Sequence, residues 1–163
     1  MPQLSAAQHA AIQIIAAGLD DATFDWALTG SMSFALQGVA IVPNDIDLQT
    51  DAMGAYACAE RFAAAIVQPV QFLSAASIRS HFGALLIAGV KVEIMGALQK
   101  RLANGEWEEP VRVAEHRVWV RYGELRLPAL DLAYEARAYR MMGRIARAER
   151  LEEFLARPTE RQA

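Results

Sequence analysis

The sequence predicts an α+β fold in which helices flank a mixed β-sheet, with a short helical tail at the C-terminus. Three observations support this prediction. The 163 residues are 54% hydrophobic, which is enough for one substantial core. Apolar residues recur at helical spacing near both ends of the chain, while segments between them alternate polar and apolar residues as strands do. Helix and strand patterns interleave in the first half, and strands follow one another in the second. We expect residues 1–163 to form one domain.

The first half of the chain carries clear helix and strand signals. Ser5 and Gln8 match a capping box, and the apolar spacing that follows predicts a helix over residues 6–18. Residues 26–29 are typical of a short buried strand. The further elements expected here are a helix at 32–37 that stops at Gly38, a turn at 41–44, a strand at 45–49, and a helix capped by Thr50 or Asp51 that runs to about residue 66.

The second half is expected to be mainly β-structure until a C-terminal helical region. Gly89 is typical of a hairpin turn between two strands. Pro128 is expected to introduce the C-terminal helices, which Gly143 would interrupt. The other elements expected here are strands at 70–73, 83–88 and 90–95, a helical turn at 97–103, and β-structure at 111–113 and 116–127 with a turn at Tyr122-Gly123.

Composition excludes several classes of function. The formal net charge of −3 argues against a broad nucleic-acid-binding surface. A single cysteine, Cys58, excludes an internal disulfide framework and a cysteine-rich zinc site. The most apolar stretch, 82–98, is interrupted by Lys91 and Glu93, which argues against a membrane span. The N-terminus lacks the pattern of a signal peptide, so the cytoplasm is the expected compartment.

Two aspartates form the most informative pattern. Asp45 and Asp47 are two residues apart on an expected strand, so their side chains share a face, with Cα atoms about 6.6 Å apart. Ile46 and Leu48 point to the opposite, buried face. Two carboxylates so close repel each other unless a cation lies between them, and Mg²⁺ prefers such oxygen ligands. An exposed polar pair is the alternative interpretation.

Glu93 extends this pattern on a later strand. It lies between two β-branched residues in an expected strand. If this strand is the neighbour of the strand with the two aspartates, Glu93 completes a cluster of three carboxylates. Such a cluster can hold one or two metal ions for an in-line phosphoryl or nucleotidyl displacement. Lys91 shares the face of Glu93 and could neutralise phosphate charge or form a structural salt bridge. A surface acid on an edge strand is the alternative for Glu93.

Gly30-Ser31 lies between an expected strand and an expected helix. Backbone N–H groups at the start of a helix suit an anionic phosphate, and Gly30 permits a close approach of the backbone. An ordinary helix cap is the alternative.

The order of these residues resembles the DNA polymerase beta-like nucleotidyltransferase superfamily. The matching residues are Gly30-Ser31, thirteen intervening residues, Asp45-Ile-Asp47-Leu48, and a later acid at Glu93. The match is close over residues 26–48. In size the chain is most similar to the small bacterial members of the antibiotic-modifying and toxin–antitoxin branches.

The resemblance implies a nucleotidyltransferase-like mixed sheet and transfer of a nucleoside monophosphate, AMP in our prediction, from ATP to a hydroxyl of an unidentified acceptor. Asp45, Asp47 and Glu93 would be the catalytic ligands of one or two Mg²⁺ ions. Gly30, Ser31 and Lys91 would bind the nucleotide. The acceptor is a small molecule or a macromolecule, and a homo-oligomer or a toxin–antitoxin-type protein partner stays open.

The third acid departs from the common pattern. The superfamily commonly has Asp there, and Glu93 is one methylene longer. The alternative function is therefore a catalytically degenerate nucleotide- or partner-binding module, antitoxin-like, on the same fold. Further candidates for phosphate contact or for a base are Arg61, Arg79 and His81, each of which also fits an ordinary surface role.

Overall fold

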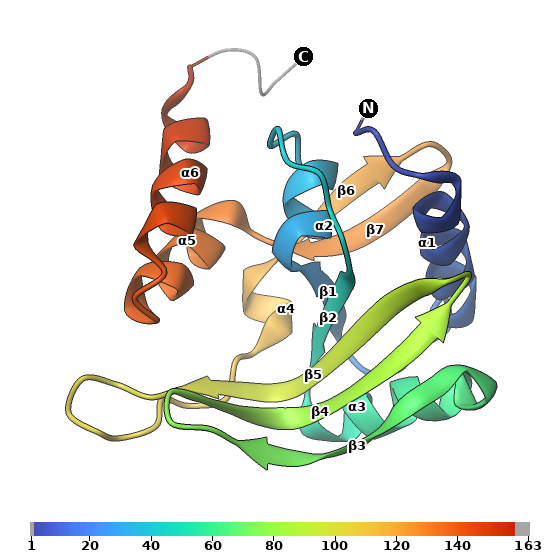
Figure 1. Cartoon of the computed structure of the whole chain (residues 1–163), viewed down its shortest axis with the longest axis horizontal. Coiled ribbons are helices and arrows are strands. Elements are labelled where there is room, and N and C mark those ends of the chain that lie inside the picture. Colours follow the sequence, from blue (N-terminus) through green and yellow to red (C-terminus); the bar gives the residue numbers. More distant parts are fainter. Residues whose placement is uncertain (1, 159–163) are drawn as a thin grey trace.

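A seven-stranded mixed sheet forms the centre of the computed structural model, which describes residues 2–158 (Figure 1). The strands are β1 (Trp26–Thr29), β2 (Ile46–Thr50), β3 (Ile66–Ser74), β4 (Ile78–Ile87), β5 (Val90–Lys100), β6 (Arg117–Tyr122) and β7 (Leu125–Leu130). The helices are α1 (Ala6–Gly18), α2 (Gly30–Leu36), α3 (Ala52–Arg61), α4 (Val113–His116), α5 (Leu132–Met141) and α6 (Ile145–Ala156), with a 3-10 turn at Ala63–Ala65.

The sheet order is β3-β4-β5-β2-β1-β7-β6, which places β2 at the centre. β2 pairs in parallel with β5, and β1 pairs in parallel with β7. All the other neighbouring strands are antiparallel. The predicted α+β class with a mixed sheet flanked by helices is thus confirmed. The parallel pair β2–β5 sets Asp47 opposite Glu93 and Gln49 opposite Met95.

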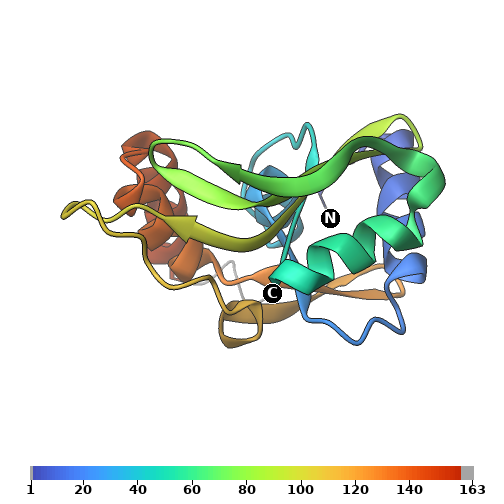
Figure 2. The same cartoon turned by 90° about the horizontal axis from the view of Figure 1, so that it is seen from below.

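The two faces of the central strands differ sharply. Ile46 and Leu48 of β2 and Ile94 of β5 are almost fully buried in one hydrophobic cluster with residues of α1 and α3. The opposite face carries Asp47 and Glu93, because successive side chains of a strand point to opposite faces. Figures 1 and 2 show α1 and α3 at one end of the sheet and the C-terminal helices α5 and α6 at the other.

A second core holds the C-terminal helices against α2. Phe34 of α2 is 1% exposed, and its ring meets that of Tyr139 of α5 edge-on, with centroids 5.9 Å apart. The buried residues of this cluster are Phe34, Val39, Leu132, Ala136, Tyr139, Ala148 and Leu151. The cluster fixes α5 beside the carboxylate face of the sheet.

The N-terminal elements match the sequence prediction closely. The Ser5–Gln8 capping box is present, with both reciprocal hydrogen bonds, and α1 spans the predicted residues. Two boundaries differ where the site begins. α2 includes Gly30 and Ser31 in its first turn, and β2 starts at Ile46, so Asp45 lies just before the strand rather than in it.

Several predictions for the middle of the chain are wrong in their boundaries or their type, and β4 begins at Ile78 rather than at residue 83. α3 ends at Arg61, and β3 begins already at Ile66 after the 3-10 turn. The helical turn expected at 97–103 is absent, because β5 continues to Lys100. Within β5, Ala97 has a φ of +52° and the register with β4 shifts, since Arg79 to His81 lies opposite Gln99 to Gly96. One extra residue of β5 is accommodated there, as in a β-bulge.

The β-to-helix transition near the C-terminus also differs from the prediction. Residues 111–113 form no strand, and α4 begins at Val113. Pro128 lies inside β7 instead of introducing the helices. β7 accommodates the proline because it makes only one paired rung with β1, Leu28 to Ala129. The break at Gly143 is confirmed, with a φ of +76° between α5 and α6.

Across residues 2–158, every helix is too short or too polar to cross a bilayer.

The second core should dominate the attachment of α5 and α6. We expect Phe34→Ala to lower the free energy of unfolding by about 3–5 kcal/mol, because it empties a closed aromatic site. Phe72→Ala is the matched control, since Phe72 is 51% exposed, and its loss should stay within about 1 kcal/mol. Urea unfolding followed by circular dichroism measures both values. Equal losses in the two variants would contradict the role of this cluster.

Candidate active site

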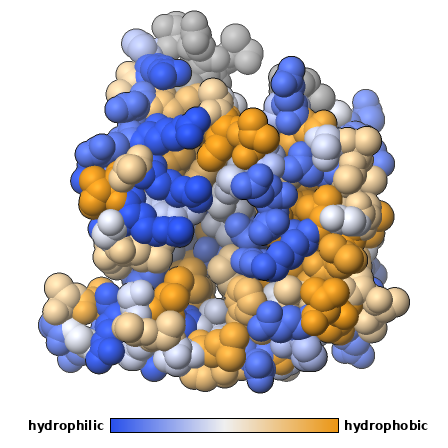
Figure 3. All heavy atoms as spheres, viewed as in Figure 1, coloured by the Kyte–Doolittle hydropathy of each residue, from blue (hydrophilic) through white to orange (hydrophobic). Residues whose placement is uncertain are grey.

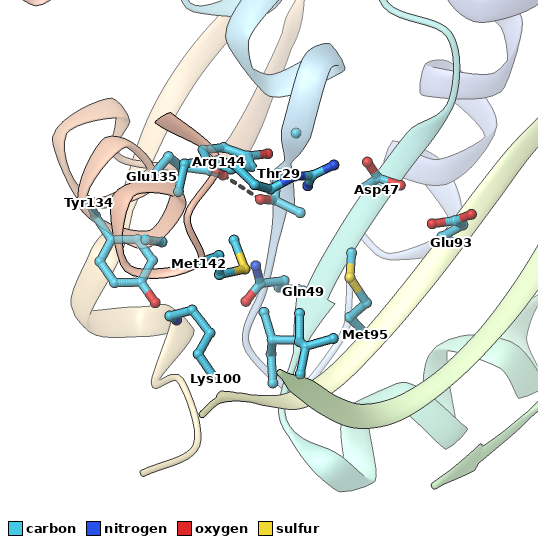
Figure 4. A pocket seen from close by; sticks show the side chains of 15 residues that line it. Thr29, Asp47, Gln49, Glu93, Met95, Lys100, Tyr134, Glu135, Met142 and Arg144 are labelled. Carbon is cyan, nitrogen blue, oxygen red and sulfur yellow. Dashed lines mark hydrogen bonds between the residues drawn. The ribbon is translucent and has the colours of Figure 1, made fainter. Parts of the chain in front are cut away.

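Asp47 and Glu93 form a rung of two carboxylates at the centre of the sheet. The parallel register of β2 and β5 sets them directly opposite each other, and Figure 4 shows both side chains on the same face. Burial, followed by the charges of Glu93 and Asp45, raises the pKa of Asp47 to about 7. Two like charges forced together in a half-buried place hold a proton unless a cation neutralises them.

Asp45 stands close to this rung but outside the cavity beside it. Its charge contributes to the raised pKa of Asp47, whereas its side chain does not line the cavity. Within residues 2–158, no group of three or more His, Cys, Asp or Glu side chains is gathered closely enough to hold a metal ion. The structure thus brings two of the three predicted acids together and leaves Asp45 at their side.

Gly30 comes into direct contact with the carboxylate rung. Its φ is +69°, and a Cβ atom added there would lie 2.5 Å from Oδ2 of Asp47. Any other residue would therefore be strained in its backbone and would collide with the carboxylate. Ser31 follows in the first turn of α2 and does not line the cavity.

Lys91 lies at the rim of the site. Its Nζ atom is 2.9 Å from Oε1 of Glu93, and its side chain is 51% exposed. This contact, together with the charge of Glu93, raises the pKa of Lys91. This position is consistent with both interpretations of Lys91, the structural salt bridge and the phosphate contact, since an exposed ammonium group at the rim can also reach a phosphate.

Glu135 is a carboxylate that the sequence interpretation missed. It belongs to α5, is 4% exposed, and accepts a hydrogen bond from the hydroxyl of Thr29. Burial raises the pKa of Glu135 to about 7, although hydrogen bonds from Thr29 and the Gly30 backbone oppose the rise. An acid on the apolar stripe of α5, with Leu132, Ala136 and Tyr139, was the signal available in the sequence.

The rung forms one end of a cavity of about 190 Å³. In the space-filling view the surface is hollowed between the hydrophilic surface of the C-terminal helices and the strands beside them (Figure 3). The walls come from β1, α2, β2, β4, β5, α5 and the turn after α5. The lining residues are Thr29, Gly30, Asp47, Gln49, Ile78, Glu93, Met95, Leu98, Lys100, Tyr134, Glu135, Ala138, Tyr139, Met142 and Arg144.

The end of the cavity away from the rung is polar as well. Lys100 is 3% exposed and its Nζ atom pairs with Oε1 of Glu108 at 2.5 Å. The Oε1 atom of Gln49 is buried and has no hydrogen-bond partner among the described residues. Leu98 and Lys100 reach the same cavity as Glu93 because the extra residue at Ala97 shifts the alternation of β5.

The remaining sequence candidates lie elsewhere. Arg61 pairs with Asp21, and Arg79 lies over the ring of Trp107. His81 hydrogen-bonds to the hydroxyl of Tyr56 at 2.9 Å. None of these three side chains lines the cavity, whereas Arg144 does.

Comparisons with known proteins identify a family and similar folds. Residues 11–155 match the family model described as aminoglycoside-2″-adenylyltransferase. A candidate nucleotidyltransferase from Thermotoga maritima is 42% identical, with a TM-score of 0.79 over 90% of this chain and 91% of that one. The lincosamide antibiotic adenylyltransferase LnuA, solved with lincomycin bound, has the same fold at 10% identity, with a TM-score of 0.56 over 91% of this chain and 98% of that one. A search of curated proteins found no match.

The family match covers most of the chain, and it confirms the resemblance to the nucleotidyltransferase superfamily. This chain belongs to the aminoglycoside-2″-adenylyltransferase family of nucleotidyltransferases.

Proposed function

We propose that residues 1–163 form a single metal-dependent nucleotidyltransferase domain that transfers AMP from ATP to a hydroxyl of a small-molecule acceptor. The observation that carries this proposal is the Asp47–Glu93 rung beside Gly30 at one end of a cavity. The adenylyltransferase family supports ATP as the donor. Aminoglycosides and lincomycin are the first acceptors to test, because the family and a neighbouring fold are described by them.

The residues of the rung fit a magnesium ion. Burial and the charges of Glu93 and Asp45 raise the pKa of Asp47, although Lys91 pairs with Glu93, and a bound cation would favour the charged form of Asp47. Carboxylate oxygens are the ligands that Mg²⁺ prefers, and Mg²⁺ usually combines one or two of them with phosphate oxygens of a substrate. The Asp47–Glu93 rung offers two carboxylates, which matches this mode of coordination, and no group of three or more His, Cys, Asp or Glu side chains is gathered within residues 2–158. Asp47 and Glu93 would be the principal ligands, with Asp45 joining from the side.

The ion, when bound, would neutralise the phosphates and orient the bond that breaks. The protein would supply position and exclusion of water. Gly30 lets the backbone come close to the rung, and Ser31 and Lys91 are the proposed contacts of the phosphates beside it. Glu135 fixes the turn between β1 and α2 through the hydroxyl of Thr29. The acceptor hydroxyl would approach the phosphorus from the open side of the cavity.

A catalytically degenerate binding module is the second candidate. The ion pair between Lys91 and Glu93 favours this candidate, because the carboxylate of the third acid, Glu93, is then already paired with a cation. Such a module would bind nucleotide or a protein partner without releasing pyrophosphate.

Replacement of the two aspartates tests catalysis. We expect Asp45→Asn and Asp47→Asn each to lower magnesium-dependent pyrophosphate release from ATP, in the presence of an acceptor, by about a hundredfold or more. Asp20→Asn is the matched control, because Asp20 is exposed and outside the cavity, and it should keep wild-type activity. Full activity in both site variants would refute the mechanism. Nucleotide binding without pyrophosphate release in the wild type would favour the degenerate module.

The pH dependence of stability tests the electrostatics of the same rung. The pKa of Asp47 is raised from 3.8 to about 7 in the folded protein. The folded state therefore holds a proton that the unfolded state releases, and the free energy of unfolding falls as the pH rises from about 4 to about 7. Asp47→Asn removes this loss, so we expect the metal-free variant to be more stable by on the order of 4 kcal/mol at pH 8.

Urea unfolding at pH 4 and pH 8 in the presence of a chelator measures this difference. At pH 4 the variant and the wild type should be nearly equal, because Asp47 is then protonated. Magnesium should raise the melting temperature of the wild type and leave that of Asp47→Asn unchanged. A variant that is less stable than the wild type at pH 8 would show that the Asp47 carboxylate stabilises the metal-free fold, which contradicts the prediction.

A further inference from the structure

We propose that the inner end of the cavity binds the adenine base of the nucleotide, and that Gln49 is the residue that recognises it. The proposal rests on the proposed function, since it takes ATP as the donor. It adds a base-recognition site formed by Gln49 together with the apolar side chains Met95, Leu98 and Met142.

Gln49 has an unsatisfied polar group that requires a partner. The residue is 7% exposed, and its Oε1 atom makes no hydrogen bond within the described residues. A buried acceptor without a partner costs about 1–3 kcal/mol of stability. A bound ligand that donates a hydrogen bond would remove this cost. Figure 4 shows the amide directed into the cavity. The cavity end is therefore built for a ligand that donates a hydrogen bond.

The volume of the cavity limits how much of a ligand can be enclosed. A volume of about 190 Å³ equals about six water molecules, whereas sites for whole ligands usually measure about 300–1,000 Å³. A single ring system fits inside, and the rest of the molecule has to extend beyond it. A complete aminoglycoside or lincosamide is too large for this end.

The position of Gln49 links that ring to the phosphate site. Gln49 follows Asp47 by two residues on the same face of β2, so their Cα atoms are about 6.6 Å apart. A ring held at Gln49 and a phosphate held at the rung therefore belong to one molecule, with a short spacer between them. In ATP the ribose is this spacer.

The chemistry of the walls favours a flat heteroaromatic ring. Met95, Leu98 and Met142 present apolar surface, and methionine sulfur makes favourable contacts with aromatic rings. Gln49 and Lys100 supply polar groups to the same cavity. A sugar ring has polar groups on every edge, and those facing the methionines would remain unpaired.

The amide of Gln49 matches the edge of adenine. A glutamine side chain offers an acceptor and a donor side by side, and adenine offers an amino group beside a ring nitrogen, so both bonds form at once. On the edge that adenine presents with its N6 amino group and N7, guanine has two acceptors, O6 and N7, so one of them would face Oε1. The site should therefore prefer ATP to GTP.

Calorimetric titration with three probes tests the site: adenosine without metal, and ATP or GTP with Mg²⁺. We expect the wild type to bind ATP at least about tenfold more tightly than GTP. Gln49→Leu should weaken binding of ATP and of adenosine about tenfold or more and change GTP binding less than about threefold. Gln71→Leu is the matched control, because Gln71 is exposed on β3, and it should change nothing.

Thermal unfolding separates recognition from a structural role. Gln49→Leu should melt at the wild-type temperature or above it, because it removes a buried acceptor that has no partner. Equal loss of ATP and GTP binding together with a lower melting temperature would overturn the proposal and make Gln49 a structural residue. Unchanged ATP binding in Gln49→Leu would overturn it as well.

Failure of the proposed function gives a different pattern. If adenosine binds and depends on Gln49 while no acceptor elicits pyrophosphate release, the base site stands and the catalytic proposal falls. If ATP is consumed but its binding ignores Gln49, the transferase stands and the base site falls. The Asp45→Asn/Asp47→Asn double variant should lose the magnesium-dependent part of ATP binding and keep binding of adenosine.

Discussion

The parallel pairing of β2 with β5 is the constraint on which the rest of the molecule depends. It joins strands that are separated by α3 and two further strands, and it sets Asp47 opposite Glu93 and Gln49 opposite Met95. The same pairing buries Ile46 and Ile94 on the other face, against α1 and α3. A slip of one residue would exchange the acidic face for the apolar one, so the hydrophobic core itself holds the carboxylates in place.

The acids at this site are stabilised by their surroundings only in part. Asp47 and Glu135 both have a pKa near 7 because burial disfavours their charged forms. Thr29 donates to Glu135, and Arg147 opposes the rise at both acids, yet a net deficit of positive charge remains. Shifted pKa values of this kind cluster at functional sites and also occur in structural ion-pair networks. Both acids line the same cavity, so their shifted pKa values mark one part of this nucleotidyltransferase-family fold.

How far the sequence can be interpreted depends on the range of each interaction. The Asp47–Glu93 rung was predictable, because both acids alternate with apolar residues in strands, and Gly30 was predictable from its place before a helix. The pairing of Glu135 with Thr29 was not, because the two residues lie 106 positions apart and the burial of Glu135 needs the second core. Gln49 shares the face of Asp47 by simple alternation, but only the covering helix α5 turns it from a surface residue into a buried one.

The extra residue at Ala97 has a consequence for how such a protein can diversify. Its φ of +52° decides that Leu98 and Lys100, and not Ala97 and Gln99, line the cavity. A β-branched residue at this position would disfavour that conformation and straighten the strand. The alternation would then bring the neutral amide of Gln99 to the cavity and turn the cation of Lys100 away. A change of backbone conformation at position 97 would thus exchange the charged residue of the pocket for a neutral one, although residues 98–100 keep their identity.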